Sequence, residues 1–212
     1  IRNKAQKLNL KLRNLGLQDY NKTWASMINV ILSKGQDDPD ELWLLEHLPV
    51  YTLGFGASKN HILSSGNIPV IRSDRGGEVT YHGPGQIVAY FLLNLRRLGW
   101  GPKRLINELE ALVIEFLNQY EIHSSRRSGN PGVYIENMKI SSVGLKIKRG
   151  YSYHGLSINI DMDLEPFRNI NVCGKKSTEV TQLKEFVNIS IEKAKKDFEE
   201  IVKTGLTGGS FF

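Results

Sequence analysis

The chain has 212 residues, of which 40% are hydrophobic and 24% are charged, a composition typical of a soluble globular protein. Its one cysteine excludes an internal disulfide, so we expect a reducing compartment, either the cytoplasm or the matrix of an organelle. The net charge of +6 favours an acidic partner, but the sequence motifs of nucleic-acid-binding proteins are absent. The longest nearly apolar stretch, 87–95, is far too short to span a membrane.

The first half of the sequence predicts one helix and then a set of short strands. The helix covers 19–34, where Asp19 is the expected N-cap and Gly35 the expected stop. Beyond it, short β-like runs are separated by glycine, proline and asparagine, and together they predict a sheet. These runs are 41–47, 50–53, 69–73, 78–82 and 86–95.

The second half predicts a long helix, further strands and a final helix. Apolar residues recur along 104–119 with the spacing of one buried helix face, and the final helix covers 188–203 and stops at Gly205. The predicted strands, of which the last two are joined by a turn at 148–150, are 133–135, 139–147 and 151–160. We therefore predict a single α/β domain over 1–212, in which helices flank a mixed β-sheet.

Cys173 is the first candidate for chemistry. A lone cysteine is usually a small buried hydrophobe, yet Gly174 permits close approach here, and Lys175 and Lys176 supply positive charge that favours a thiolate. An ordinary thiol, with a pKa of about 8.5, is mostly protonated at neutral pH. One lysine ammonium about 4 Å from the sulfur contributes on the order of 4 kcal/mol, and about 2 kcal/mol suffices to lower the pKa by about 1.5. One well-placed lysine is therefore enough to keep a large fraction of the Cys173 thiol ionised at neutral pH.

Lys139 is the candidate for that lysine. It interrupts an apolar strand-like run between Met138 and Ile140, where a charged residue is out of pattern. A lysine that faces solvent is the alternative interpretation, because alternate side chains of a strand face water. The small residues that follow, 141–144, leave room for a ligand and indicate a pocket wall.

A glycine-rich run over 75–86 is the second unusual feature. Its glycines let the backbone turn tightly and approach a bound molecule, although two ordinary turns around a hairpin would have the same pattern. The spacing fits neither the dinucleotide-binding fingerprint nor the phosphate-binding loop. His82 in this run and His154 farther on each precede a glycine, which suits residues that orient a substrate, and a structural role is the alternative.

Two further patterns concern partners and metals. Lys146, Lys148 and Arg149 form a basic patch at the predicted turn, which is either simply solvated or a docking surface for an acidic carrier protein. No cluster of histidine, cysteine or carboxylate residues in the sequence has metal-ligand spacing, so no metal is expected.

Taken in order, several motifs resemble those of the lipoyl(octanoyl) transferases over nearly the whole sequence. The matching segments are 15–20 with Trp24, 75–86, 139–144, 154–156, 163–164 and 173–174. The resemblance implies the fold of the biotin and lipoate protein ligases, with Cys173 as the nucleophile that carries an acyl thioester and Lys139 as the group that lowers its pKa. The substrate-binding positions that it implies are Arg75, Gly76, Gly77, Glu78, Val79, Thr80, Tyr81, His82, Ser142, Val143, Gly144, Gly155, Leu156 and Ser157.

The reaction implied by the resemblance is octanoyl transfer from octanoyl-acyl carrier protein to a lysine of lipoyl domains, in 2-oxoacid dehydrogenase complexes and in the glycine cleavage H protein. It requires no cofactor and no ATP. Two positions depart from the family pattern, because Val172 and Phe91 stand where proline is expected and leave free a backbone torsion that proline would fix.

Two other functions compete with this interpretation. An ATP-dependent lipoate- or biotin-protein ligase of similar fold is the alternative enzyme, but the pair of Cys173 and Lys139 favours the transferase. An acyl-binding or nucleic-acid-binding module without turnover is the alternative outside enzymes, and it explains the positive charge but not the cysteine.

Overall fold

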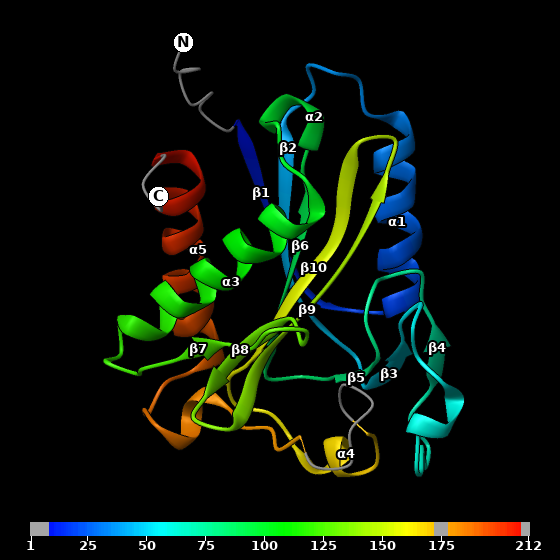
Figure 1. Ribbon diagram of the computed structural model, residues 1–212, viewed down its shortest axis with the longest axis vertical. Coiled ribbons are helices and arrows are strands. Elements are labelled where there is room, and N and C mark those ends of the chain that lie inside the picture. The colour runs from blue at the N-terminus through cyan, green and yellow to red at the C-terminus, as the bar shows by residue number, and fades with distance from the viewer. Residues whose placement is uncertain (1–8, 172–177, 209–212) are drawn as a thin grey trace.

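A mixed seven-stranded sheet runs through the middle of the computed structural model, which describes residues 9–171 and 178–208 (Figure 1). β1 and β2 are parallel, and each later neighbouring pair is antiparallel. In spatial order the strands are β1 (Leu10–Gln18), β2 (Asp40–His47), β6 (Gln86–Leu92), β10 (Tyr151–Asn159), β9 (Met138–Lys148), β8 (Gly132–Ile135) and β7 (Ser125–Arg126).

Helices cover both faces of this sheet, because successive side chains of a strand point to opposite faces. In β6 the odd-numbered residues 87–91 pack into one apolar cluster with α3 and α5, and the even-numbered residues 88–92 pack into another with α1. None of the helices in the described ranges is long and apolar enough to cross a membrane. The helices that pack on the two faces of the sheet through these clusters are α1 (Tyr20–Ser33), α3 (Pro102–Asn118) and α5 (Ile191–Gly208).

A smaller three-stranded sheet carries part of the glycine-rich run. Its central strand β3 pairs in parallel with β4 and antiparallel with β5. Its apolar residues pack against the short helix α4 through Phe167. The elements of this region are β3 (Val50–Leu53), a 3-10 helix (Lys59–His61), β4 (Val70–Arg72), β5 (Val79–His82) and α4 (Glu165–Arg168).

Most of the elements predicted from sequence are confirmed to within a few residues, and so is the mixed sheet flanked by helices. Asp19 caps α1, because its side chain accepts a hydrogen bond of 2.9 Å from the Lys22 backbone N–H. The predicted turn joins β9 to β10 through Arg149 and Gly150, whose φ angles of 56° and 88° match the twist of a two-residue hairpin. Phe91, where proline was expected, is fully buried in β6.

Several details differ from the sequence expectation, and the short elements β7 and α4 are among those not predicted. β1 was not predicted, because charged residues alternate with the apolar ones along this edge strand. The run over 86–95 ends as a strand at Leu92, and the Asn94 side chain then caps a short helix α2 (Leu95–Leu98). α5 begins at Ile191 and continues past Gly205, which is buried inside the helix instead of ending it.

Candidate active site

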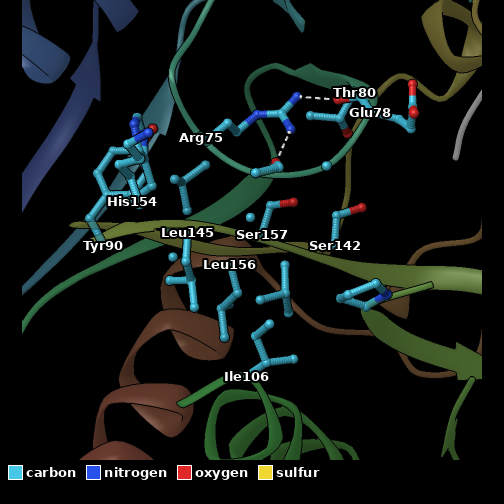
Figure 2. A pocket seen from close by; sticks show the side chains of 18 of the residues that line it. Arg75, Glu78, Thr80, Tyr90, Ile106, Ser142, Leu145, His154, Leu156 and Ser157 are labelled. Atoms are coloured by element: carbon cyan, nitrogen blue, oxygen red, sulfur yellow. Dashed lines mark hydrogen bonds between the residues drawn. The ribbon is translucent and has the colours of Figure 1, made fainter. Parts of the chain in front are cut away.

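A cavity of about 530 Å³ lies along β9, within the range of about 300 to 1,000 Å³ that ligand sites occupy. In Figure 2 the segment 75–80 of the glycine-rich run lies on one side of it, β9 and β10 cross the middle, and Ile106 of α3 lies on the opposite side. Much of the wall is apolar, with contributions from Ile106, Val79, Val88, Val143, Leu145, Ile147 and Leu156.

The cavity exists because the neighbour of β9 stops early. β8 pairs with β9 only as far as Ser142, whereas β10 continues to pair with it as far as Lys148. Over 143–148 the outer edge of β9 pairs with no other strand in the described part of the protein. The Gly76 N–H donates to the Leu145 carbonyl on this edge at 2.9 Å, which attaches the glycine-rich run to β9.

Arg75 holds the glycine-rich run in shape. Its buried guanidinium donates to the Gly76 and Glu78 carbonyls, at 2.9 and 2.8 Å, and to the Thr52 carbonyl and hydroxyl, at 2.7 and 2.8 Å. Burial lowers the pKa of Arg75 from its ordinary value. Because its donors are hydrogen-bonded to groups of the protein itself, the Arg75 side chain supports the cavity wall that it lines.

Two glycines permit the close approaches that shape the cavity. A Cβ on Gly144 would lie 3.0 Å from the Gly76 carbonyl oxygen, where the glycine-rich run crosses β9. A Cβ on Gly155 would lie 1.9 Å from the Ala89 carbonyl oxygen of β6. Gly155 therefore has no room for a side chain, and a side chain at Gly144 would require the glycine-rich run to shift by a few tenths of an ångström.

Beside one end of the cavity lie five aromatic polar residues that we call the histidine cluster: Tyr20, His47, His82, Tyr90 and His154. Their rings contact one another at centroid distances of 5.2 to 6.2 Å. All except His47 line the cavity, and Figure 2 shows Tyr90 and His154 together on one side of it, far from Ser142.

Hydrogen bonds determine which nitrogen of each cluster histidine carries the proton. His47 Nδ1 lies 3.0 Å from the Gln18 carbonyl and therefore donates, so its Nε2 accepts from the Tyr90 hydroxyl at 2.7 Å. His82 Nδ1 donates to the Gln86 side-chain oxygen at 2.7 Å. His154 Nε2 donates to Asp74 at 2.9 Å, and its buried Nδ1 has no partner among the described residues.

Burial keeps these imidazoles uncharged at neutral pH. Desolvation lowers the pKa of His47 to about 4 and the pKa of His82 to about 3. Desolvation also lowers the pKa of His154, although the Asp74 carboxylate opposes it. In the described ranges no group of histidine, cysteine or carboxylate residues is arranged to hold a metal ion.

Lys139 lies toward the other end of the cavity and is only 5% exposed, so the solvent-facing interpretation is wrong. Its Nζ donates a hydrogen bond to the Pro131 carbonyl oxygen at 3.0 Å and lies 5.5 Å from the centre of the Tyr134 ring. β9 rises about 3.3 Å per residue, so Lys139 lies about 20 Å along the strand from Leu145, the pairing partner of His154.

The backbone of Lys139 is bonded to the segment that follows Cys173. The Lys139 N–H donates to the Glu179 carbonyl at 2.8 Å, and the Thr181 N–H donates to the Lys139 carbonyl at 3.0 Å. The segment just after the predicted nucleophile is therefore attached at the predicted activating residue.

The segment that precedes Cys173 is attached beside the glycine-rich run. The Asn171 N–H donates to the His61 carbonyl at 2.7 Å, and His61 Nδ1 lies 2.9 Å from the carboxylate of Glu78, which lines the cavity. Cys173 itself, like Val172, lies outside the described residues. The hydrogen bonds given above therefore involve only described residues, namely Asn171 before Cys173 and Glu179 and Thr181 after it.

The structure brings the other predicted site residues together with one exception. The cavity is lined by Lys139, Arg75, Gly76, Gly77, Glu78, Val79, Thr80, His82, Ser142, Val143, Gly144, Gly155, Leu156 and Ser157. Tyr81 is the exception, because its ring packs against Tyr51 and Phe167 in the small sheet, each at a centroid distance of 5.5 Å.

Some cavity residues were not predicted as site residues. Tyr20 and Tyr90 fit the patterns of a helix start and a buried strand, and Ile106 fits the apolar stripe of α3. Pro131 contributes its backbone carbonyl, which no side-chain pattern reveals. Among these residues, only His154 could have been recognised from the sequence, because a glycine follows it as one follows His82.

The basic patch predicted at the hairpin is divided between two neighbours. Lys146 lines the cavity, and its Nζ lies 5.7 Å from the centre of the ring of Phe55, which is 83% exposed. Arg149 instead donates to the Leu32 carbonyl of α1. Of these two residues, only Lys146 belongs to the cavity.

The protein matches known proteins in sequence. The family model described as "Lipoyl protein ligase A/B catalytic domain" matches residues 19–203. The octanoyltransferase of Alkalilimnicola ehrlichii is 53% identical over 174 residues, which make up 82% of this chain and 81% of that protein. The octanoyltransferase of Pseudomonas fluorescens is 44% identical, and the match covers 94% of this chain and 97% of that protein.

Solved structures share the fold at low sequence identity. A putative lipoate protein ligase from T. acidophilum has a TM-score of 0.77 at 13% identity, and the match covers 94% of this chain and 86% of that chain. A biotin protein ligase from Aquifex aeolicus has a TM-score of 0.51 at 15% identity, with 91% and 69% covered. These similarities confirm the predicted fold of the biotin and lipoate protein ligases. The sequence matches show more: the chain belongs to the lipoyl protein ligase A/B catalytic domain family and, within it, to the octanoyltransferases.

Proposed function

We propose that this protein, acting as one catalytic domain, transfers an octanoyl group from octanoyl-acyl carrier protein to a lysine of a lipoyl domain. Cys173 carries the acyl group as a thioester, and Lys139 activates its thiol. One observation carries the proposal: a buried lysine lines a largely apolar cavity, and its backbone is bonded to the segment that follows Cys173. The octanoyltransferase relatives support the same reaction.

In the first step the Cys173 thiolate attacks the carbonyl carbon of the donor thioester. A new carbon–sulfur bond forms to the enzyme, the bond to the donor sulfur breaks, and the donor leaves as a thiolate that takes up one proton. The Lys139 ammonium favours the anionic form of Cys173, because an opposite charge nearby stabilises the charged state. The activated thiol is therefore available at neutral pH.

In the second step the neutral amine of the acceptor lysine attacks the enzyme thioester. A carbon–nitrogen bond forms, the bond to Cys173 breaks, and the amine releases one proton as the amide is completed. The same step regenerates the cysteine thiolate for the next turnover. Because the donor already carries a thioester, no nucleotide is needed to activate the acid.

The cavity suits an acyl group of eight carbons. An extended hydrocarbon advances about 1.2 Å per bond, so the seven bonds of an octanoyl group reach about 8 to 9 Å, less than the roughly 20 Å of β9 that separates Lys139 from Leu145. Burial of an acyl group of this length is worth on the order of 5 kcal/mol, at about 0.8 kcal/mol per carbon. The apolar wall, including Leu156 and Ile106, would supply this contact.

The open edge of β9 offers a place for the oxyanion that forms in each step. The Leu145 carbonyl points out of this edge, so by the alternation of an antiparallel strand the Val143 N–H points out of the same edge. Within 142–144, the segment expected to stabilise the oxyanion, we assign this role to the Val143 backbone N–H, because it faces the open edge and such a donor favours the negative charge of the tetrahedral intermediate.

The charge and the relatives also suggest partners and location. A net charge of +6 steers acidic proteins toward the enzyme, which suits acyl carrier protein as the donor and lipoyl domains as acceptors, in 2-oxoacid dehydrogenase complexes and the glycine cleavage H protein. The bacterial octanoyltransferase relatives favour the cytoplasm as the place of action.

The proposal is tested by incubation of the protein with octanoyl-acyl carrier protein and a lipoyl domain in the absence of nucleotide. We expect mass spectrometry to show an octanoyl group on the lipoyl-domain lysine. With the acceptor omitted, we expect an octanoyl adduct on Cys173, and Cys173→Ser should abolish both products.

Two results would contradict the proposal. A strict requirement for ATP and free octanoate would favour the ligase activity after which the structural neighbours are named. An adduct on another residue, or full transfer by the serine variant, would reject Cys173 as the acyl carrier.

A further inference from the structure

The short loop 129–131 and Gly132, the first residue of β8, pack directly on the side chain of Lys139. The Pro131 carbonyl accepts the hydrogen bond from Lys139 Nζ at 3.0 Å. Gly132 has a φ of +136°, and a Cβ there would lie 2.7 Å from Lys139 Cε and 2.2 Å from the Ser141 carbonyl oxygen. The position of this loop therefore decides where the ammonium can sit.

Glu110 of α3 holds that loop from behind. It is 4% exposed, and its Oε1 accepts a hydrogen bond of 2.8 Å from the Gly132 N–H. Its Oε2 lies 3.5 Å from Nε of the partly exposed Arg126. Desolvation raises the pKa of Glu110, while the Gly132 N–H and the charges of Arg126 and Lys139 act in the opposite direction.

We infer that Glu110 is a positioning residue for Lys139. Its carboxylate fixes the Gly132 amide, and the adjoining Pro131 carbonyl is thereby held where it accepts from the Lys139 ammonium. The inference rests on the proposed function, in which that ammonium activates the thiol of Cys173.

The indirect arrangement has a chemical advantage over a direct ion pair. A carboxylate in contact with the ammonium would neutralise much of the charge that the thiolate of Cys173 requires. A carbonyl orients the ammonium and leaves its net charge in place. Glu110 binds the Gly132 N–H of the same peptide group, so it fixes the Pro131 carbonyl without itself pairing with the ammonium in place of the thiolate.

Two substitutions separate position from charge. Glu110→Gln keeps the length and the acceptor oxygen for the Gly132 N–H but removes the charge. Glu110→Asp keeps the charge but withdraws the acceptor by one methylene. Glu108 is the matched control, because it is a buried glutamate of the same helix that pairs with the exposed Arg104 instead of the loop.

The readout is the rate of iodoacetamide alkylation as a function of pH, and it is unambiguous because Cys173 is the one cysteine of the protein. We expect Glu110→Asp to move the pH midpoint of alkylation upward by about one unit, which slows alkylation at neutral pH by up to about tenfold. Glu110→Gln should restore the wild-type profile, and Glu108→Asp should not change it. Single-turnover acylation by the octanoyl donor should slow in parallel for Glu110→Asp, with KM for the donor unchanged.

Lys139→Ala in the same series distinguishes the two ideas. If it moves the midpoint upward but Glu110→Asp behaves as Glu108→Asp does, Glu110 does not position the lysine and only this inference fails. If Lys139→Ala leaves the midpoint unchanged, the proposed activation of Cys173 fails, and the role of Glu110 fails with it. A Glu110→Gln variant that shifts as far as Glu110→Asp would show that the negative charge of Glu110 is itself required, and the inference that its hydrogen bond to Gly132 is sufficient to position the lysine would fail.

Discussion

The two ends of the cavity contain polar groups that are almost equally buried, yet they treat charge in opposite ways. In the histidine cluster (Tyr20, His47, His82, Tyr90 and His154), desolvation removes the charge, and the pKa of His82 falls to about 3. Toward the other end, Lys139 is buried to a similar extent and donates its Nζ to the Pro131 carbonyl, with Glu110 behind the loop. The difference begins with the groups themselves, because the ordinary pKa of a lysine, about 10.4, lies far above that of a histidine, about 6.5.

This contrast matches the chemistry proposed for each end. A thioester exchange needs positive charge only where the sulfur reacts, so an ammonium belongs beside the segment that follows Cys173, which is bonded to the backbone of Lys139. An acyl group gains nothing from charge, and an imidazolium would hold water in the cavity. A polar but uncharged cluster leaves that part of the cavity suitable for an apolar ligand.

Removal of the charge at the lysine end should have the largest effect. We expect Lys139→Ala to slow the formation of the Cys173 octanoyl adduct at pH 7 by about thirtyfold, because a thiol with the ordinary pKa of about 8.5 is only about 3% thiolate at that pH. Single-turnover mass spectrometry measures this rate. The exposed Lys22 of α1 is the control, and Lys22→Ala should react as the wild type does. An alanine variant of Lys139 with near-normal rates would remove the charge contrast between the two ends.

Displacement of the lysine, with its charge intact, should come next. Gly132→Ala places a Cβ 2.7 Å from Lys139 Cε at a φ of +136°, so we expect about 3 kcal/mol lower free energy of unfolding and slower acylation. Urea denaturation measures the stability. The control is Gly66→Ala, since Gly66 also has a positive φ but open space around it. It should cost about 1 kcal/mol and leave acylation unchanged. Equal losses for the two variants would mean that contact with Lys139 is unimportant.

The buried histidines at the other end of the cavity should make the free energy of unfolding depend on pH. The pKa values of about 4 for His47 and about 3 for His82 in the folded protein lie below the ordinary value of about 6.5 expected in the unfolded protein. Between these values the unfolded protein binds more protons. The free energy of unfolding is therefore fully developed above pH 6.5 and declines as the pH falls, by about 1.4 kcal/mol per pH unit for each histidine.

The substitution His82→Asn tests that slope. The Asn side-chain N–H can still donate to the Gln86 oxygen, but it does not titrate. We expect urea denaturation between pH 6.5 and 4.5 to give a slope shallower by about 1.4 kcal/mol per pH unit. The exposed His123 is the control, and His123→Asn should keep the wild-type slope. An unchanged slope for His82→Asn would show that burial does not suppress its charge.

The residues that could be predicted from sequence are those whose side chains break a local pattern. Lys139 interrupts an apolar strand, and the glycines near Arg75 have no role in an ordinary strand, so both indicated a pocket. The fold followed from periodicity, because α3 and most strands have clear apolar patterns.

The residues that could not be predicted are those whose role depends on distant packing. Glu110 lies in a helix where a glutamate is normally solvated, and only the approach of Gly132 from a later segment gives it a partner. Tyr90 belongs to a buried strand, and only His47 from another strand makes its hydroxyl part of a cluster. Ile106 is a similar case, since its stripe predicts burial but does not say that a cavity lies against it.

Ile106 provides the last and smallest test, because it acts on the apolar wall between the two ends and changes no charge. Ile106→Ala removes three carbons that face the cavity, so we expect about 1 kcal/mol weaker binding of the acyl group, or about a fivefold higher KM for the octanoyl donor. A butyryl donor, whose acyl group is shorter, should respond less. Ile114 of the same helix is also half-buried but lies outside the cavity wall, so Ile114→Ala should leave KM unchanged. If both variants raise KM equally, the octanoyl group does not lie against α3, and the wall between the two ends would have to be assigned to other residues.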